Sequence, residues 1–356
     1  RTSIVSRPAL LCASSAEPLR KTAASVEIAA TDYHTAGEPF RIISGGVPAI
    51  YGDTVLDKRL YAMEKLDDIR RLVVNEPRGH ADMYGCFIAE PDDQGADFGA
   101  VFFHNAGYST ACGHGTIALA TWALESGLVS VVEPETSIVI DVPSGRLESF
   151  ASVEDGRVES VCFRNVPSFV YEEGLSVTTS VGQIAVDIAF GGAFYACVDA
   201  RKIDLGLTPL NVADFISLGR EIKNSINDAH EISHPLEPRL RDIYGTIFFA
   251  ETEGGGPLRQ RNVTIFADGE VDRSPCGSGT SARLALLDNS GRLLRGDTLT
   301  HESIIGTEFG GRVVGETRVG EFDAVITDVE GSAYLTGYHQ FVLHKDDPLG
   351  TGFLLR

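Results

Sequence analysis

Long hydrophobic runs are missing from this 356-residue sequence. A transmembrane helix needs roughly 20 consecutive apolar residues, and no stretch approaches that length, so we expect no membrane partner. Positive charge is also scarce, because 30 lysines and arginines stand against 50 aspartates and glutamates, a formal net charge of -20. An acidic chain gains nothing from the counterion release that drives binding to nucleic acid or to an anionic lipid surface. These absences leave a small molecule as the expected partner.

Cysteine is sparse and dispersed. None of the six cysteines forms a Cys-x-x-Cys pair or a cysteine and histidine cluster with zinc spacing; they stand at 12, 86, 112, 162, 197 and 276. The sequence therefore predicts neither a metal site nor a disulfide framework. Free thiols are typical of a cytosolic protein, which makes the cytoplasm the expected compartment. Cys86, Cys162 and Cys197 lie in apolar, strand-like runs, and we interpret them as small buried hydrophobic residues.

Acidic residues are nearly absent from residues 1–26. This arm holds four basic residues and one acidic residue, a net charge of about +3, whereas the remainder of the chain carries about -23. A leader that contains serine and arginine and few acidic residues is typical of an organelle-targeting segment, and here it would direct the protein to mitochondria. An unstructured arm has the same composition, so the role of residues 1–26 is left open.

The sequence repeats itself, which is its strongest positive signal. EPRGHADMYGCFIA at 76–89 has a partner in EPRLRDIYGTIFFA at 237–250, and CGHGTIALATWALESG at 112–127 has a partner in CGSGTSARLALLDNSG at 276–291. In both halves the order is Glu-Pro-Arg, then Asp-x-Tyr-Gly, then the cysteine motif. Two matched segments in one order are hard to produce by chance, so we interpret the chain as two halves of one design. A favoured strand-to-helix turn used twice is the alternative.

Strand-like runs outnumber helical runs. Short alternating or apolar stretches bounded by Gly, Pro, Asn and Asp predict strands over most of the chain, and helices are predicted at 66–74, after Cys112, at 211–227 and after Cys276. Because the helices do not alternate strictly with the strands, a doubly wound parallel sheet is disfavoured. We expect an α+β protein with two pseudo-symmetric domains, each a curled sheet around a central helix. The expected segments are the arm at 1–26, a first half at 27–186, a second half at 187–335, and a C-terminal segment at 336–356 that returns to the first half.

Each repeated cysteine stands where a helix is expected to begin. Glycines there allow positive φ and bring backbone N–H groups close to a ligand. We expect Thr116 and Thr280 to cap the two helices, and Gly127 and Gly291 to close them. A helix N-terminus lowers the pKa of a thiol from about 8.5 by one to several units, and its free N–H groups form a site for a carboxylate or a phosphate. The motif thus predicts a reactive thiol beside a bound anion.

Two such motifs facing one ligand would place a thiol on each face of a single carbon atom. If a thiolate removes the proton α to a carboxylate and the opposite thiol returns a proton, the stereocentre is inverted. Helix N–H groups would stabilise the charge that develops on the carboxylate. The pattern therefore predicts a two-base racemase or epimerase.

Phosphate-binding loops, dinucleotide sites and cysteine hydrolase sites match the two cysteine motifs less well. No Gly-Lys-Ser/Thr follows the glycines, as a P-loop requires, and GHGTIA lacks the third glycine and the acidic residue of a dinucleotide site. A cysteine hydrolase stays open as an alternative because His114 lies beside Cys112, but the second half has Ser278 at the equivalent position. A single nucleophile would also leave Cys276 without a role.

These motifs resemble those of the proline racemase family, which comprises proline racemases, 4-hydroxyproline 2-epimerases and trans-3-hydroxy-L-proline dehydratases. The resemblance runs from about residue 30 to the end of the chain, and it rests on HTAGEPFRI, NEPRGHADMYG, CGHGT, GGAFYA, DRSPCGSGTSA and DPLGTGFLLR. It implies a cofactor-independent enzyme with the diaminopimelate epimerase-like fold and an active site between two domains.

The resemblance also implies roles for particular residues. Cys112 and Cys276 correspond to the two acid/base thiols of the family. The residues that would hold the substrate carboxylate are Gly113, His114, Gly277 and Ser278. Asp272 corresponds to the partner of the ring nitrogen, and a carboxylate is a suitable counter-ion for a secondary ammonium. A turn residue before Arg273 is the structural alternative for Asp272.

The branch of the family is left open between two activities. Cys276 favours inversion at the α-carbon of proline or hydroxyproline, because the resembled dehydratases usually have threonine at this position. The flanking sequences YSTACGH and GGAFYA are closer to those of the dehydratases, which convert trans-3-hydroxy-L-proline into pyrroline-2-carboxylate. We therefore predict a racemase or epimerase, with the dehydratase as the alternative. The ring substituent and the oligomeric state are left open, a homodimer being one option.

Overall fold

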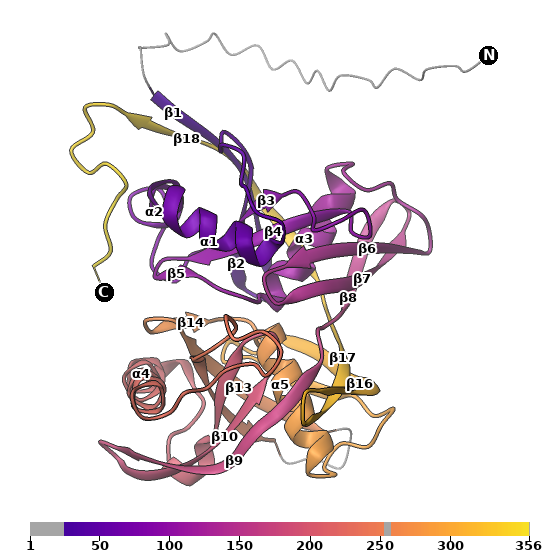
Figure 1. Cartoon of the computed structure of the whole chain (residues 1–356), viewed down its shortest axis with the longest axis vertical. Coiled ribbons are helices and arrows are strands. Elements are labelled where there is room, and N and C mark those ends of the chain that lie inside the picture. Colours follow the sequence, from indigo (N-terminus) through magenta and orange to yellow (C-terminus); the bar gives the residue numbers. More distant parts are fainter. Residues whose placement is uncertain (1–24, 253–257, 356) are drawn as a thin grey trace.

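The computed structural model describes residues 25–252 and 258–355, and it shows two bodies stacked one above the other (Figure 1). Residues 1–24, which make up most of the basic arm at 1–26, lie outside the described residues. Within the described residues, no helix has the length and apolar character needed to cross a membrane.

The upper body holds the chain from its first described strand to β8 (Figure 1). Its strands are β1 Ser25–Thr35, β2 Glu38–Gly45, β3 Tyr84–Ala89, β4 Phe98–His104, β5 Gly107–Tyr108, β6 Glu135–Val142, β7 Gly145–Glu154 and β8 Arg157–Arg164. Its helices are α1 Val55–Lys65, α2 Asp67–Val74 and α3 Gly113–Glu125. The sequence predicted α2 and α3 but missed α1, although Thr54 and Asp57 form a capping box at its start.

The lower body holds β9 to β17. Its strands are β9 Ser168–Thr179, β10 Gly182–Phe190, β11 Phe194–Asp199, β12 Ile243–Glu251, β13 Arg259–Phe266, β14 Glu270–Asp272, β15 Leu299–Glu302, β16 Glu308–Val319 and β17 Phe322–Gly331. Its helices are η1 Ala200–Ile203, η2 Pro209–Asn211, α4 Val212–Ala229 and α5 Gly277–Asn289. The sequence predicted both α4 and α5.

The two bodies repeat one pairing scheme. In the upper body β2 runs parallel to β3, β3 antiparallel to β4, and β4 parallel to β6. In the lower body β11 runs parallel to β12, β12 antiparallel to β13, and β13 parallel to β15. A local backbone conformation is repeated as well. Asp82 and Asp242 have φ of 61° and 64°, and each stands two residues before the repeated tyrosine. The repeat in the sequence is therefore a repeat of structure.

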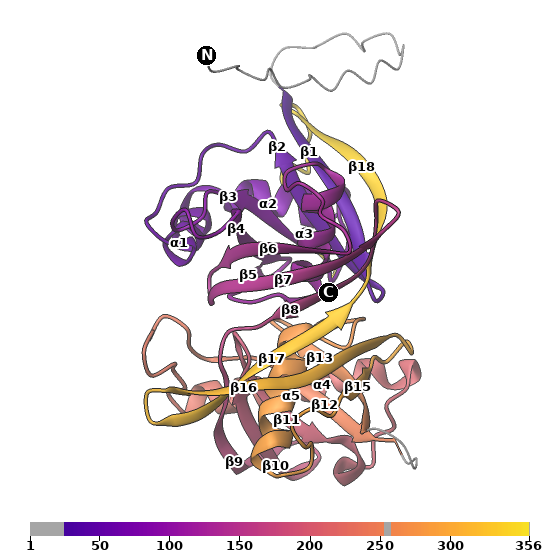
Figure 2. The ribbon, with the colours of Figure 1, turned by 90° about the vertical axis from the view of Figure 1, so that its right-hand side faces the viewer.

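A long helix lies inside each curled sheet, as the sequence predicted (Figure 2). Both α3 and α5 are buried along most of their length, which suits a helix that is packed on all sides. Gly127 and Gly291 follow these helices with φ of 74° and 65° and close them as predicted. At one buried position the two helices differ in charge, because α5 carries Arg283 where α3 carries Leu119.

The chain crosses between the bodies twice. The first crossing joins β8 to β9 near residues 165–167, so residues 168–186 lie in the lower body and not in the first half, where the sequence analysis placed them. Pairing of β17 with both β8 and β9 links the two bodies through backbone hydrogen bonds. After β17, β18 (Ala333–His344) returns and pairs with β1 along its length (Figure 2). The sequence predicted a C-terminal return to the first half, but partners this far apart in sequence leave no local pattern that shows which strands pair or in which register.

Candidate active site

The two cysteine-bearing helices point their N-termini at each other across the boundary between the bodies. Gly113 and Gly277 are the first residues of α3 and α5, and a Cβ atom on Gly113 would lie 2.4 Å from the Cα of Gly277. A Cβ atom on Gly277 would lie 2.7 Å from the Cα of Gly113. Glycine at both positions permits this approach. The free N–H groups of both helices are therefore held close together.

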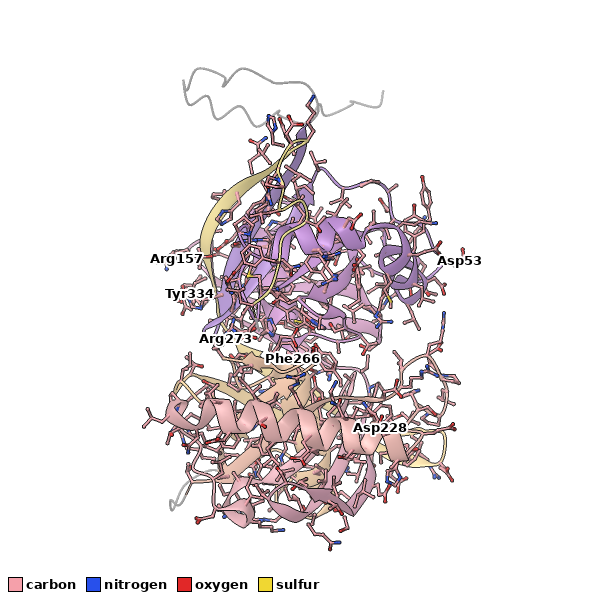
Figure 3. All side chains as sticks on the ribbon, turned by 90° about the vertical axis from the view of Figure 1, so that its left-hand side faces the viewer. Asp53, Arg157, Asp228, Phe266, Arg273 and Tyr334 are labelled. Carbon is pink, nitrogen blue, oxygen red and sulfur yellow. The ribbon has the colours of Figure 1, made fainter. Side chains whose placement is uncertain are left out.

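A narrow cavity of about 10 Å³ lies at this meeting point. Its walls include each residue that the sequence analysis named for the site, which are Cys112, Gly113, His114, Asp272, Cys276, Gly277 and Ser278. The rest of its wall consists of Tyr84, Ala111, Tyr195, Tyr244 and Phe266. Figure 3 labels Phe266 at the boundary between the two bodies. The fold thus brings the predicted residues of both halves together.

Cys112 is the N-cap residue of α3. Its Sγ accepts a hydrogen bond from the Gly115 N–H at 3.3 Å and lies 3.5 Å from Nε2 of His114. The prediction that Thr116 caps this helix was wrong, because the helix begins at Gly113. Thr116 lies in the first turn and donates its hydroxyl to the Cys112 carbonyl at 2.8 Å, and Thr280 makes the same contact in α5.

Cys276 occupies the equivalent position in α5 with a different backbone conformation. Its φ is 64°, whereas that of Cys112 is -154°. A positive φ is unfavourable for a residue with a side chain, and such strain concentrates at functional sites. The Cys276 thiol points to the Tyr195 hydroxyl oxygen at 3.8 Å, and that hydroxyl lies 2.7 Å from Oγ of Ser278. The strain and the polar contact favour a chemical role over simple packing.

Burial controls the ionisation of both thiols. It raises the pKa of Cys112 well above the ordinary value, although the Gly115 N–H lowers it, and the charges of Asp272 and Glu38 raise it further. Burial also raises the pKa of Cys276, and Asp272 adds to that shift. The expectation that helix N-termini lower both thiol pKa values was therefore wrong, because desolvation outweighs the N–H groups. A thiolate in this cavity needs additional positive charge beside it.

Asp272 and His114 carry different charges at neutral pH. Burial raises the pKa of Asp272 to about 6, while hydrogen bonds from Ser274 lower it. Asp272 is therefore mostly ionised at pH 7, and its Oδ1 accepts the Ser274 N–H at 2.8 Å and the Ser274 hydroxyl at 2.7 Å. Burial, together with the charge of Arg273, lowers the pKa of His114 to about 3, so its imidazole is neutral. The cavity thus combines an anionic carboxylate with a neutral imidazole.

Three tyrosines of the cavity were missed by the sequence analysis as site residues. Tyr84 and Tyr244 come from the two Asp-x-Tyr-Gly segments, and their hydroxyl oxygens lie 3.1 Å apart. The Tyr84 hydroxyl also bonds with Ser109, while Tyr195 lies beside Cys276. Burial raises the pKa of all three tyrosines, so their hydroxyls stay protonated. The available signal was the repeat, which sets a tyrosine at the start of a strand in each half.

Glu38 and Arg273 join the two bodies next to the cavity. Oε2 of Glu38, on β2, accepts the backbone N–H of Arg273 at 2.8 Å and lies 2.9 Å from its Nε. Arg273 directly follows Asp272 and appears at the boundary between the bodies in Figure 3. Glu38 is fully buried, and its Oε1 lacks a hydrogen-bond partner among the described residues. The contact holds the segment that carries Asp272 against the upper body.

Comparison with known proteins agrees with this geometry. The model of the proline racemase family matches residues 30–354. A trans-3-hydroxy-L-proline dehydratase of Bacillus thuringiensis subsp. konkukian is 48% identical over 324 residues, which cover 91% of this chain and 97% of that protein. A 3-hydroxyproline 2-epimerase of Burkholderia multivorans is 46% identical over 333 residues, which cover 93% of this chain and 99% of that protein.

Solved structures also resemble this chain. The crystal structure of a hydroxyproline epimerase from Agrobacterium vitis with bound trans-4-hydroxy-L-proline has a TM-score of 0.86 and 35% identity, over 93% of this chain and 96% of that one. The prediction of the α+β, diaminopimelate epimerase-like fold is confirmed. The chain belongs to the proline racemase family and is an enzyme of that family.

Proposed function

We propose that this enzyme inverts the α-carbon of proline or a hydroxyproline, with Cys112 and Cys276 as its two acid/base groups. One observation carries the proposal. The two thiols come from opposite halves of the chain, yet both line one cavity at the N-termini of α3 and α5. A second thiol at the equivalent helix start has a direct use in inversion, which needs a proton acceptor on one face of the carbon and a proton donor on the other.

Substrate binding would use charges that the cavity already presents. The substrate carboxylate would accept hydrogen bonds from the N–H groups at the starts of α3 and α5. The ring ammonium would pair with Asp272, which is mostly ionised at neutral pH. That ammonium also supplies the positive charge that the buried thiols lack, so substrate binding itself would favour one thiolate.

Proton transfer then follows from the positions of the two sulfur atoms. The thiolate on one face takes the α-proton, and the electron pair of the broken C–H bond moves into the carboxylate, where helix N–H groups stabilise it. The opposite thiol donates its proton to the other face of the carbon and becomes a thiolate. The stereocentre is inverted, the protonation states of Cys112 and Cys276 are exchanged, and both proton transfers use protein side chains alone.

Dehydration of trans-3-hydroxy-L-proline is the second candidate, and the 48% identity to a protein named as that dehydratase favours it. This reaction breaks the α-C–H bond and the C3–O bond, releases water, and leaves pyrroline-2-carboxylate after tautomerisation. One thiolate is sufficient to remove the α-proton. The departing hydroxyl would take a proton from a donor in the cavity wall, where Tyr84, Tyr195 and Tyr244 keep their hydroxyls protonated.

One experiment separates these functions. The purified enzyme is incubated in deuterated water with L-proline and with the 3- and 4-hydroxy isomers, and we follow α-deuterium by NMR, optical rotation by polarimetry, and pyrroline-2-carboxylate by chemical trapping. Inversion predicts α-deuteration with a change in rotation, while dehydration predicts the trapped imine from the 3-hydroxy isomer alone. Binding without α-deuteration or imine for any of these compounds would contradict both enzymatic functions.

A further inference from the structure

A second cavity, of about 300 Å³, lies in the lower body toward the C-terminal end of α5. Its wall includes Leu286 and Leu287 in the last turns of this helix and Ser290 just after it, and it shares no residue with the cavity between the two cysteines. Strands β9 to β12 supply most of the rest of the wall, together with Arg201 and Lys202 of η1, Arg283 of α5 and Arg292 after that helix.

Arg283 is the residue in this cavity that packing alone does not explain. Its exposed fraction is 4%, its guanidinium carbon lies 3.5 Å from the ring centroid of Phe249, and its Nε donates to Oε1 of Gln260 at 3.3 Å. The ion pairs in the described wall of this cavity are Arg201–Asp199 and Arg292–Glu251, and neither includes Arg283, whose other polar neighbour is the Cys197 thiol. Burying a cation outside an ion pair is unfavourable, and burial lowers the pKa of Arg283.

The internal repeat shows that the fold itself does not require an arginine there. When the two cysteine motifs are aligned, Arg283 of α5 corresponds to Leu119 of α3. Leu119 is fully buried in the upper body, and both residues lie at the same place in a helix inside a curled sheet. An aliphatic residue therefore satisfies the packing of this position, and the guanidinium is an addition that calls for a ligand.

Charges around the cavity favour a ligand that carries both signs. Arg201 pairs with Asp199, and Arg292 pairs with Glu251, each at 2.6 Å. The charged wall residues outside these pairs are Arg283 and Lys202, which are basic, and Glu173 and Asp187, which are acidic. Asp187 accepts a hydrogen bond from the Gly174 N–H at 2.9 Å, and Glu173 accepts one from the Asn289 side-chain amide at 3.1 Å. The donors in both bonds are uncharged.

We propose that this cavity is a second ligand site, which binds a small zwitterionic α-amino or α-imino acid. The planar guanidinium of Arg283 would hold the ligand carboxylate with two parallel hydrogen bonds, an arrangement for which arginine is suited. The ligand ammonium would lie against Asp187 and Glu173. Phe249, Leu286 and Leu287 supply the apolar part of the wall for the carbon skeleton.

The site is tested by the stoichiometry of binding, measured by isothermal titration calorimetry with L-proline and with L-alanine as probes. If the candidate active site also binds L-proline, the wild-type enzyme takes up two equivalents and Arg283→Leu takes up one. If the proposed function fails and the first cavity binds nothing, the wild type takes up one equivalent and Arg283→Leu takes up none. Arg283→Leu introduces the residue found at the equivalent position of α3, so we expect it to fold.

Further variants and probes make the test specific. Asp187→Asn, which removes one anionic contact, should weaken the same binding event at least tenfold, whereas Arg295→Leu, which removes an exposed arginine outside this cavity, should leave it unchanged. Prolinamide lacks the carboxylate and inorganic phosphate lacks the ammonium, so neither should show the Arg283-dependent event. Equal stoichiometry in the wild type, Arg283→Leu and Asp187→Asn with both amino acids would overturn the proposal. Phosphate binding as tight as that of L-proline would overturn the assignment to a zwitterion.

Discussion

Gly113 of the upper body and Gly277 of the lower body are in direct backbone contact, so the two helix N-termini meet without any side chain between them. Each glycine opens its own central helix, and each directly follows a cysteine of the cavity. The separation of the two thiols therefore depends on this contact, and an added methyl group on either glycine would push the bodies apart.

We expect Gly277→Ala to reduce turnover by at least about 100-fold, because displacing reacting groups by about 1 Å has an effect of that size. The new Cβ would lie 2.7 Å from the Cα and 3.0 Å from the carbonyl carbon of Gly113, and these backbone atoms cannot move aside as the end of a flexible side chain can. The control is Gly45→Ala, whose Cβ would meet Ala29 at an ordinary 3.6 Å. Steady-state kinetics of both variants measure the effect, and wild-type turnover by Gly277→Ala would show that the contact does not position the thiols.

Replacing Cys276 by serine should stop inversion, because a serine hydroxyl is a far weaker acid than a thiol and cannot alternate between donor and acceptor. Loss of a general acid or base lowers a rate by about 10²–10⁴-fold, and polarimetry on the preferred substrate would measure it. Cys162→Ser, at a half-buried thiol outside the cavity, is the matched control and should retain activity. Near wild-type inversion by Cys276→Ser would contradict the two-thiol mechanism, and imine formation that survives in this variant would instead favour the dehydratase.

The activity should fall at acid pH through the protonation of Asp272. Only the ionised carboxylate pairs with a ring ammonium, and the pKa of Asp272 is about 6. Accordingly kcat/KM should be nearly constant from about one pH unit above that value and should drop about tenfold per pH unit well below it. Asp272→Asn should show low activity at every pH without this acid limb. A wild-type profile that is flat from pH 7 to pH 5 would rule out Asp272 as the partner of the nitrogen.

Glu38→Ala should weaken both stability and catalysis. It removes the acceptor of the part-buried Arg273 N–H and one of the two carboxylates beside the Arg273 guanidinium, the other being Asp82, which costs about 1–3 kcal/mol in the free energy of unfolding, and it releases the segment that holds Asp272. Glu38→Gln keeps an acceptor oxygen and should recover most of both losses. Asp323→Ala breaks an exposed ion pair with Arg318 and should cost less than about 1 kcal/mol. Denaturant unfolding measures the stability of the three variants, and steady-state kinetics measure their kcat/KM. An unchanged free energy of unfolding in Glu38→Ala would show that the Glu38–Arg273 contact does not stabilise the fold.

Local signals in the sequence were sufficient for the two central helices and for the cysteines, glycines and Asp272 that line the cavity. A helix start is encoded by a few neighbouring residues, so the glycines around Cys112 and Cys276 were enough to predict α3 and α5. The repeat predicted two related halves, and the comparisons confirm the fold and the family. The roles of the two cysteines, the carboxylate-binding residues and Asp272 stay predictions, which the proposed experiments address.

Tertiary structure decided what depends on residues far apart in the chain. Strand pairing placed 168–186 in the lower body and set the register of β18 against β1, and packing between the bodies set Tyr84 against Tyr244 and Glu38 against Arg273. It also reversed the expected direction of the thiol pKa shifts, because a motif shows the N–H groups around a sulfur atom but not how deeply that atom is buried. Desolvation depends on the whole surrounding structure, and here it outweighs the helix N-terminus that the sequence alone reveals.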